Sequence, residues 1–568
     1  MTPKADDWDT HAWDRVVDVV VVGTGVAAGA AAAAASRAGA SVVLCEKAEF
    51  PGGTTARSGG GMWIPNNFHL RAEGCHDDRE RMIRYMARSA YPARYRPQHP
   101  TLGLSVREYD LIGCFYDHAA EVVDELLADG VVSMYGHDFP DYYSDLPECA
   151  PWGHQLAPVL PEGWKRGDPG GGELLAAQLR AAAEARGNET LLQCEVVDVL
   201  HNTGGEVIGV EARRRRETLL LGARRGVVFG SGGFLHHEQL VADSLRGPVF
   251  GGAGSATCTG DLIGIALRYG AQLANMNNAW WTQLVVEQAL HQRVTSRDVF
   301  YAYGDSMLMV NRLGRRVVNE KSPYTDRGQA HFHWDTGRHD FSNRVLFMIF
   351  DEAVRTSDLR SDTSIRGSRM GRYPVPFPEE TPSYLVSGND WTELAEGIAQ
   401  RLQKLAPELG PVGLDERFVE RLIATVETFN GYARDGRDPE FCRGETLIER
   451  AWASTTRPDA QNDSMYPLRD RGPYHCVILG AGALDTKGGP ATDVHGRILD
   501  TRGRVIPGLY GAGNCVASPS GQAYWGPGCT IGIGVTFGYL AGRHAASQPV
   551  RAAGLDVRRA EANSGSRS

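Results

Sequence analysis

Two glycines and a glutamate near the beginning of the chain have the spacing of a phosphate- and ribose-binding site. Gly23 permits a tight turn, and Gly25 would let a phosphate group approach the backbone. Ala28 replaces a third glycine and is still small enough for a helix to pack closely on a strand. Glu46 follows where an acidic side chain would accept hydrogen bonds from a ribose hydroxyl. These residues predict dinucleotide binding.

The elements that must position these residues can be recognised in the flanking sequence. Residues 16–22 are almost all valine and predict a buried parallel strand. An alanine-rich segment up to Ala38 predicts a helix whose first N–H groups would face a pyrophosphate. Residues 41–45 predict a second strand that ends at Glu46. This order predicts a Rossmann-like α/β domain, and a glycine-rich turn without a ligand is the weaker alternative.

A second glycine-rich segment follows directly, at residues 52–61. Its sequence, GGTTARSGGG, is too rich in glycine for a regular helix or strand. Small hydroxyl residues between glycines suit a loop that holds phosphate or ring atoms through backbone contacts. An NAD-dependent dehydrogenase does not usually need a second clamp here, whereas an FAD bound along its whole length does. We therefore expect FAD.

The composition is that of an ordinary globular protein. Of the 568 residues, 42% are apolar and 23% are charged, and the length predicts two or more domains. A net charge of −10 argues against nucleic acid or an anionic membrane as a partner. The ten cysteines lack metal-type spacing, so no metal site is expected. No signal peptide or transmembrane segment is evident, so we expect a cytoplasmic protein.

Further motifs extend this pattern along most of the chain. Residues 225–234 resemble a second glycine-rich strand end, 259–261 a Thr-Gly-Asp element, and 506–514 a C-terminal flavin-binding strand. Thr530 would then begin a helix aimed at the flavin ring. The combination resembles the flavoprotein superfamily that includes fumarate reductase and the 3-ketosteroid dehydrogenases. In its succinate dehydrogenases a histidine near the second loop joins FAD covalently. Residues 54–61 contain no histidine, so the resemblance implies non-covalent FAD.

The motifs and the resemblance together imply cofactor contacts by residues that are mostly glycine or small and polar. The set contains Gly23, Gly25, Val26, Ala27, Ala28, Glu46, Lys47, Gly53, Thr54, Thr55, Ser58, Gly59, Gly60, Gly61, Val196, Ser231, Gly232, Gly233, Asp261, Gly513, Asn514, Thr530 and Ile531.

Two positions separate the branches of this superfamily. Fumarate reductases use an arginine in a segment like N-E-x-x-x-R to deliver a proton, and a second arginine before the final helix to hold the dicarboxylate. Tyr324 and Trp525 stand at these positions here, so a dicarboxylate would lack its bidentate partners. The resemblance to 3-ketosteroid Δ1-dehydrogenases is better, because residues 524–528 match their C-terminal Y-x-G-x-G segment.

That resemblance implies the catalytic roles. The Tyr524 hydroxyl and the Gly528 N–H would donate to the ketone oxygen, as in an oxyanion hole. Tyr324 would remove the α proton as a phenolate, a base strong enough for a ketone, once a second tyrosine and positive potential had lowered its pKa. A P-D-Y segment supplies that second tyrosine, with Tyr142 expected and Tyr143 as the alternative.

The remaining aromatic residues of these segments are assigned to substrate contacts. Tyr143 and Trp525 are expected to touch the substrate. The tandem pair Trp280 and Trp281 resembles a feature of the same branch, and it either lines an apolar substrate channel or packs at the domain junction.

Because FAD motifs occur at both ends of the chain, the FAD-binding domain is expected to be discontinuous. We place it at residues 1–278 and 456–550, with an inserted α+β catalytic cap domain at 279–455 and a flexible tail at 551–568. No internal repeat is evident.

The leading hypothesis is flavin-dependent desaturation of a cyclic ketone, with 3-ketosteroid Δ1-dehydrogenation as the first reaction to test and an unidentified electron acceptor as partner. One rival hypothesis is the Δ4-(5α) branch, where we expect a hydroxyl residue at the position of Gly526. A dehydrogenase of a smaller cyclic ketone is a second rival. A flavin-binding module without catalysis is a third.

Overall fold

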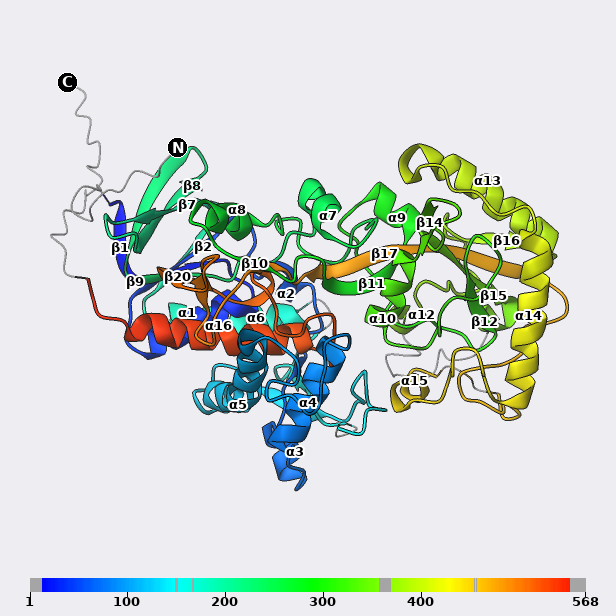
Figure 1. The fold of residues 1–568 in the computed structure, drawn as a ribbon, viewed down its shortest axis with the longest axis horizontal. Coiled ribbons are helices and arrows are strands. Elements are labelled where there is room, and N and C mark those ends of the chain that lie inside the picture. Colours follow the sequence, from blue (N-terminus) through cyan, green and yellow to red (C-terminus); the bar gives the residue numbers. More distant parts are fainter. Residues whose placement is uncertain are drawn as a thin grey trace.

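The computed structural model describes residues 13–148, 152–165, 168–356, 369–453, 455 and 457–551. The expected tail therefore lies outside the described residues, apart from Arg551. Figure 1 shows two sheet-centred regions side by side, with the nucleotide-binding sheet on the left and the cap sheet on the right. Within the described part of the chain, no helix is long and apolar enough to cross a membrane.

The nucleotide-binding sheet has eight strands and is centred on β1 (Arg15–Val22). β1 pairs in parallel with β2 (Val42–Glu46) on one side and with β9 (Glu217–Phe229) on the other. Its valines are therefore buried on both faces, which explains the continuous β-branched run. The expected strand–helix–strand unit is present. The other strands are β6 (Glu189–Leu192), β7 (Cys194–His201), β8 (Val207–Arg214), β19 (Arg497–Leu499) and β20 (Val505–Gly511).

Helix α1 (Val26–Arg37) packs closely between its neighbours because small residues face it. On one side is α16 (Cys529–Ser547), where a Cβ at Gly538 would lie 2.2 Å from the Ala27 carbonyl oxygen. On the other side is α6 (Gly171–Glu184), where Leu179 approaches Gly29. Glycine and alanine at these contacts let the helix backbones approach closely.

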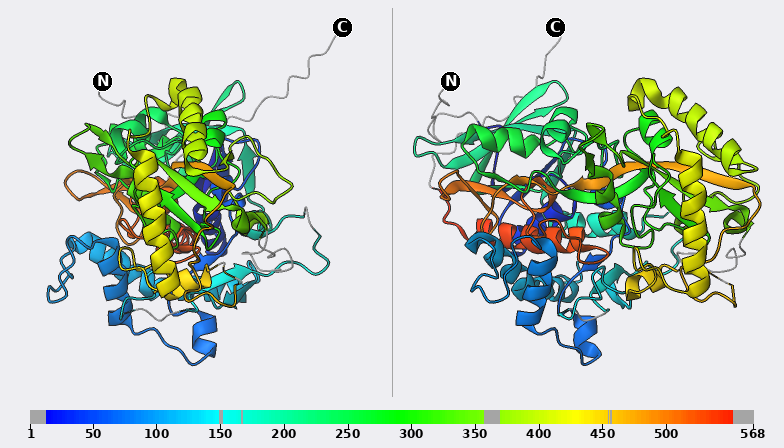
Figure 2. Two further views of the ribbon diagram at one scale, coloured as in Figure 1. Left: turned by 90° about the vertical axis from the view of Figure 1, so that its right-hand side faces the viewer. Right: turned by 45° about the vertical axis from the view of Figure 1, so that its right-hand side comes forward.

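The cap is built on a five-stranded antiparallel sheet. It contains β11 (Ala279–Val285), β12 (Met307–Val310), β15 (Val345–Asp351), β16 (Val386–Gly388) and β17 (Tyr474–Thr486). Helices α13 (Trp391–Leu409) and α14 (Phe418–Asp435) bury apolar side chains against this sheet, and the left view of Figure 2 looks onto α14. The predicted boundary at residue 455 is therefore wrong for the sheet. β17 pairs with β11, β15 and β16 and so belongs to the cap.

A third unit includes the helices drawn below the nucleotide-binding region in Figure 1. It consists of the small sheet β3 (Met62–Trp63), β5 (Gln155–Pro158) and β4 (Met134–His137) together with α4 (Arg79–Ala90) and α5 (Val106–Ala128). The remaining elements are α2 (Gly53–Ala56), α3 (Phe68–Ala72), α7 (Glu238–Ser244), α8 (Asp261–Arg268), β10 (Leu273–Ala274), α9 (Val286–His291), α10 (Tyr324–Gln329), β13 (Trp334–Asp335), β14 (Asp340–Phe341), α11 (Glu352–Thr356), α12 (Arg369–Arg372), α15 (Leu447–Ala451) and β18 (Gly489–Pro490).

Candidate active site

A cavity of about 1330 Å³ is lined by residues of the nucleotide-binding sheet, the cap and the third unit. All the predicted cofactor residues line it except Ala28 and Gly233. Ala28 instead packs against the backbone of Gly230, as its small size predicts. Gly233 lies behind the cavity, where its N–H donates to the Asp485 carboxylate at 2.9 Å. The scattered glycine motifs therefore converge on one site.

The nucleotide half of the cavity is fixed by hydroxyl groups of the two glycine-rich loops. The Thr24 hydroxyl donates to Glu46 at 2.6 Å and accepts from the Gly52 N–H at 2.8 Å. Thr55 accepts from the N–H of Val26 at 2.9 Å, at the first turn of α1. These bonds fasten the acidic residue at the end of β2 to the loop that follows it. Glu46 is thereby held at the strand end, where a ribose hydroxyl would meet it.

The donors along this half fit FAD. Gly25 and Gly528 are the N-caps of α1 and α16, and neither helix has a capping side chain. Both helix ends line the cavity, so their first N–H groups and positive dipole ends are available for a pyrophosphate and an anionic ring. Gly53 and Gly59 also line the cavity, and a Cβ at either would point into open space. The cavity thus has the length and the donor set of a dinucleotide site.

We predict that Gly60→Ala yields protein that binds little or no FAD. Gly60 has a φ of +73°, and a Cβ there would lie 2.4 Å from the carbonyl carbon of Gly171, so the loop must shift. The measurement is the flavin absorbance of the purified variant. Gly39→Ala is a matched control, because Gly39 has a φ of +81° but open surroundings. Equal flavin content in both variants would contradict the predicted role of this loop.

Three tyrosines from distant segments meet at the other half of the cavity. Tyr142, Tyr324 and Tyr524 all line it, and each is at most 6% exposed. Their ring centroids lie 5.5 Å (Tyr142–Tyr324), 5.4 Å (Tyr142–Tyr524) and 5.8 Å (Tyr324–Tyr524) apart. The structure thus places Tyr142 rather than Tyr143 beside Tyr324. Gly528 lines the same region.

The two residues expected to touch the substrate are placed elsewhere. Tyr143 is absent from the described cavity lining; it accepts from the Tyr524 N–H at 3.3 Å and lies 3.5 Å from a carboxylate oxygen of Asp326. It therefore supports the backbone of Tyr524. Trp525 is fully buried behind the cavity, beside the Trp63 ring at 5.4 Å, and its Nε1 donates to Ser89 at 3.1 Å. Both expected contacts are corrected.

For Trp525→Phe we therefore predict a loss of stability without a change in substrate affinity. The smaller ring leaves a void beside Trp63 and removes the hydrogen bond to Ser89, which should lower the free energy of unfolding by about 1–3 kcal/mol. Chemical denaturation measures the first effect, and KM for the best ketone measures the second. A large rise in KM with unchanged stability would return Trp525 to the substrate site.

The tandem tryptophans pack rather than line the cavity. Trp280 stacks edge-on against Tyr524 at 5.0 Å, and its Nε1 donates to Asn514 at 2.9 Å. The ammonium group of Lys487 lies 4.1 Å from its ring centroid. Trp281 packs on Phe332 at 4.7 Å. Of the two expected roles, packing at the domain junction is the one that the structure shows.

Sequence reasoning missed several aromatic residues of the cavity wall. Phe300 lies 5.1 Å from Tyr324, and Trp452 lies 5.5 Å from Tyr142 and 5.2 Å from Tyr301. All three missed residues line the cavity. They come from irregular segments of the cap, where no periodic pattern of apolar residues indicates a buried face. The sequence therefore gives no signal that these aromatic side chains line the cavity.

The electrostatic environment of the tyrosines differs from the expectation. Burial raises the pKa of Tyr324 well above its usual range, and the neighbouring Tyr142 and Tyr524 raise it further. Burial likewise raises the pKa of Tyr142 and of Tyr524. Burial therefore opposes a phenolate on any of the three tyrosines. Formation of a phenolate here requires positive charge from elsewhere.

The comparisons with known proteins show the family of the chain. Residues 18–531 match the family model described as FAD binding domain. The chain is 31% identical to a 4-oxocyclohexanecarboxylate 2-dehydrogenase of Sinomonas cyclohexanicum, over 95% of this chain and 94% of the relative. It is also 31% identical to a 3-oxosteroid 1-dehydrogenase of Mycobacterium tuberculosis, over 94% and 98%.

A solved structure shares the whole fold. The 3-ketosteroid Δ1-dehydrogenase of Sterolibacterium denitrificans, solved with 1,4-androstadiene-3,17-dione, superposes with a TM-score of 0.78 at 27% identity. The match covers 94% of this chain and 99% of that one. This protein is thus an FAD-dependent oxidoreductase, and it belongs to the FAD-binding family of dehydrogenases that includes the 3-oxosteroid 1-dehydrogenases.

Proposed function

We propose that this protein desaturates a cyclic ketone beside its carbonyl group, with the C1–C2 bond of a 3-ketosteroid as the leading position. The observation that carries the proposal is the grouping of Tyr142, Tyr324, Tyr524 and Gly528 around the part of the cavity next to the cofactor residues. The likeness to dehydrogenases of 3-oxosteroids and of 4-oxocyclohexanecarboxylate supports the same class of reaction.

The carbonyl end of the substrate is assigned to Tyr524 and Gly528. Gly528 and Tyr524 both line this part of the cavity, so we assign the Gly528 N–H and the Tyr524 hydroxyl as two donors to one ketone oxygen. Two donors on one carbonyl make the neighbouring C–H more acidic and stabilise the enolate charge that develops as the proton leaves. Gly528 is also the N-cap of α16, whose positive dipole end favours the same charge.

The proton and the hydride have different acceptors. The Tyr324 phenolate takes the proton from the α carbon, which forms a Tyr O–H bond, and Tyr142 is placed to relay that proton onward. When bound, FAD supplies the hydride acceptor for the β carbon at its N5 atom. Loss of one proton and one hydride leaves a C=C bond conjugated with the ketone. FAD is proposed to be non-covalent, because residues 54–61 contain no histidine.

An elongated apolar substrate is favoured by the walls of the cavity. Phe139, Phe300, Tyr301 and Trp452 line its inner part. The lining continues outward to Tyr135, Val159 and Leu160, which are 48%, 40% and 43% exposed. Apolar side chains from the tyrosine cluster to the surface would cover several fused rings, whereas a single ring would contact only the inner part.

A smaller keto acid is the second candidate, and one cation favours it. Arg297 lines the cavity and forms no ion pair within the described residues. A guanidinium group at the wall could hold a carboxylate at the far side of a single ring. The two candidates therefore differ in whether the cavity wall or this cation supplies most of the binding energy.

The experiment compares three ketones as substrates of the purified FAD-loaded enzyme with an artificial electron acceptor. They are a 4-ene-3-ketosteroid, a saturated 5α-3-ketosteroid and 4-oxocyclohexanecarboxylate. We expect the highest kcat/KM for the 4-ene-3-ketosteroid, with the new double bond at C1–C2 by NMR. A new bond at C4–C5 would favour the Δ4 hypothesis. A preference for the keto acid that Arg297→Leu abolishes would favour the small-ring hypothesis.

A further inference from the structure

Arg327 is a fully buried cation one helical turn after Tyr324 in α10. Its guanidinium donates to four acceptors, all of them neutral. Nη1 donates to the Ser322 carbonyl at 2.7 Å, Nη2 to the carbonyls of Val299 and Phe300 at 2.9 and 3.1 Å, and Nε to the Gln283 side chain at 3.1 Å. Within the described ranges of the chain, no carboxylate forms an ion pair with it.

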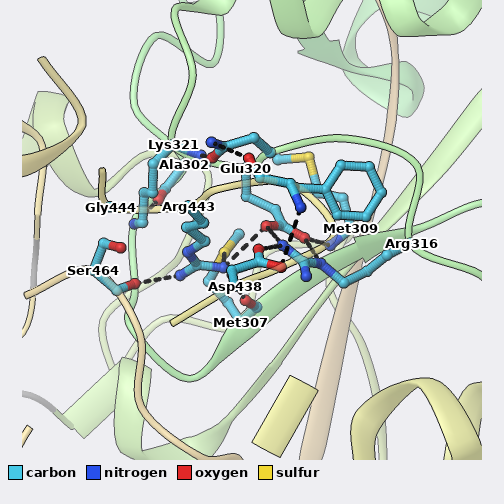
Figure 3. A network of polar contacts seen from close by, with 12 residues as sticks. Ala302, Met307, Met309, Arg316, Glu320, Lys321, Asp438, Arg443, Gly444 and Ser464 are labelled. Atoms are coloured by element: carbon cyan, nitrogen blue, oxygen red, sulfur yellow. Dashed lines mark hydrogen bonds and ion pairs between the residues drawn. The ribbon is translucent and has the colours of Figure 1, made fainter. Parts of the chain in front are cut away.

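The neighbouring buried arginines are paired quite differently. In Figure 3, Arg316 and Arg443 converge on the carboxylate of Glu320, at 2.8 and 3.1 Å, and Arg316 also pairs with Asp438 at 2.8 Å. This network neutralises its own charges, as buried arginines usually require. Arg327 therefore keeps a positive charge whose field is not cancelled by a bonded carboxylate, at a cost in desolvation. This desolvation cost is offset if the guanidinium of Arg327 stabilises a nearby group that becomes negatively charged.

The same arginine joins Tyr324 to the cavity wall. Phe300, whose carbonyl it binds, lines the cavity and packs on Tyr324 at 5.1 Å. On the other side of Tyr324, the Lys321 ammonium donates to the carbonyls of Ala302 and Gly304 at 2.5 and 2.8 Å. Lys321 and Arg327, three residues before and three residues after the tyrosine, thus hold residues 299–304 through hydrogen bonds to backbone carbonyls. The base and the aromatic wall are fastened as one unit.

We propose that Arg327 is a positioning residue that fixes Tyr324 against the cavity wall and supplies the positive charge that stabilises its phenolate. The inference rests on the proposed function of Tyr324 as base. It accounts for the positive potential that a phenolate in the buried tyrosine cluster requires. Burial lowers the pKa of Arg327 to about 10, and negative charge on Glu320 and on the two tyrosines favours its cationic form.

Other charged groups face this region and do not replace Arg327. Asp326 is adjacent in α10, and burial raises its pKa to about 7. Burial lowers the pKa of Lys487 to about 7 and that of Lys321 well below its usual range, so neither is a reliable cation near the tyrosines. The pKa of Glu320, which burial would raise, is held at about 2 by Arg316 and Arg443. Arg327 remains the cation adjacent to the base.

The test measures proton abstraction without desaturation. The flavin is kept chemically reduced so that it accepts no hydride, and the exchange of α protons of testosterone or cyclohexanone into D₂O is followed by NMR from about pH 6 to pH 11. In the wild type, exchange should rise with pH as the phenolate forms. For Arg327→Gln we expect this rise to move upward by at least about one pH unit, which is a tenfold loss of exchange at pH 7. Arg327→Lys, which keeps the charge, should shift much less.

Two further variants test the same role of Arg327. If Arg327→Gln does not fold, Gln283→Glu places a carboxylate at the atom that accepts from the Arg327 Nε, and it should shift the profile in the same direction. Arg355→Gln is the control. Arg355 is a buried arginine of the cap that binds the carbonyls of Phe377, Pro378 and Glu380 and pairs with Glu352 at 3.2 Å, and its loss should leave the profile in place.

The outcomes separate the inference from the proposed function. A uniform loss of exchange at every pH in Arg327→Gln, with no shift, would leave Arg327 a purely structural role and overturn the inference. A wild-type profile in Gln283→Glu would overturn it as well. Exchange that survives in Tyr324→Phe would instead contradict the proposed base itself, whatever the arginine variants show.

Discussion

Replacing Tyr324 with phenylalanine is expected to lower kcat for ketone desaturation by about 10²- to 10⁴-fold while the protein stays yellow with bound FAD. The substitution removes one oxygen atom and keeps the ring that packs on Phe300, Tyr142 and Trp452. The phenylalanine ring offers no proton acceptor in place of the lost oxygen. Steady-state rates and the flavin spectrum of the same preparation are the measurements.

Tyr269→Phe provides the control for Tyr324→Phe. The Tyr269 hydroxyl donates to the Val199 carbonyl at 2.7 Å in the nucleotide-binding region and is not part of the described cavity lining. Removal of this hydroxyl costs a hydrogen bond but should leave kcat close to the wild-type value. Undiminished desaturation by Tyr324→Phe, or an equal loss in both variants, would contradict the assignment of Tyr324 as base.

Tyr524→Phe is expected to lower kcat by about 10²- to 10³-fold and to raise KM for the ketone. The variant loses one of two donors to the ketone oxygen, and the remaining Gly528 N–H alone stabilises the enolate less well. Ring packing against Trp280 at 5.0 Å is retained, so the fold should persist. The rate and the binding of an unreactive ketone, measured by the change in flavin absorbance, are determined together.

The result for Tyr524→Phe can be checked against Tyr143→Phe. Tyr143 accepts from the Tyr524 N–H but does not belong to the described lining of the cavity, so its hydroxyl should matter only through the position of Tyr524. We expect a loss for Tyr143→Phe well below that for Tyr524→Phe. If the order is reversed, the carbonyl donor has been assigned to the wrong tyrosine.

The nucleotide-binding half of the site could be predicted because its requirements are local. Gly23, Gly25 and Glu46 belong to one strand–turn–helix–strand unit, so their spacing in the sequence fixes their spacing in space. The same holds for the loop at residues 52–61, which follows at once. Backbone N–H groups are the expected phosphate ligands there, and glycine occurs at the positions where a side chain would block the approach of the phosphate.

The substrate half could be predicted only in part, because it depends on contacts between distant segments. Tyr142 and Tyr143 are consecutive, so their side chains point to different sides of one short segment. The sequence does not show which of these sides faces the cavity. Trp525 follows Tyr524, the proposed carbonyl donor, yet its side chain lies outside the described cavity lining, in a cluster with Trp63 and Phe115. β17 was placed in the wrong domain because its long apolar run could complete either sheet.

The most direct test of the account is a single anaerobic turnover. The FAD-loaded enzyme is mixed with a stoichiometric amount of a 4-ene-3-ketosteroid, without any electron acceptor. The flavin absorbance should bleach once, and one equivalent of the α,β-desaturated ketone should form, with the new double bond at C1–C2 by NMR. If non-steroidal cyclic ketones bleach the flavin and steroids do not, the proposed desaturation reaction is supported and the proposed steroid substrate is contradicted. A flavin that no cyclic ketone reduces would contradict the central claim.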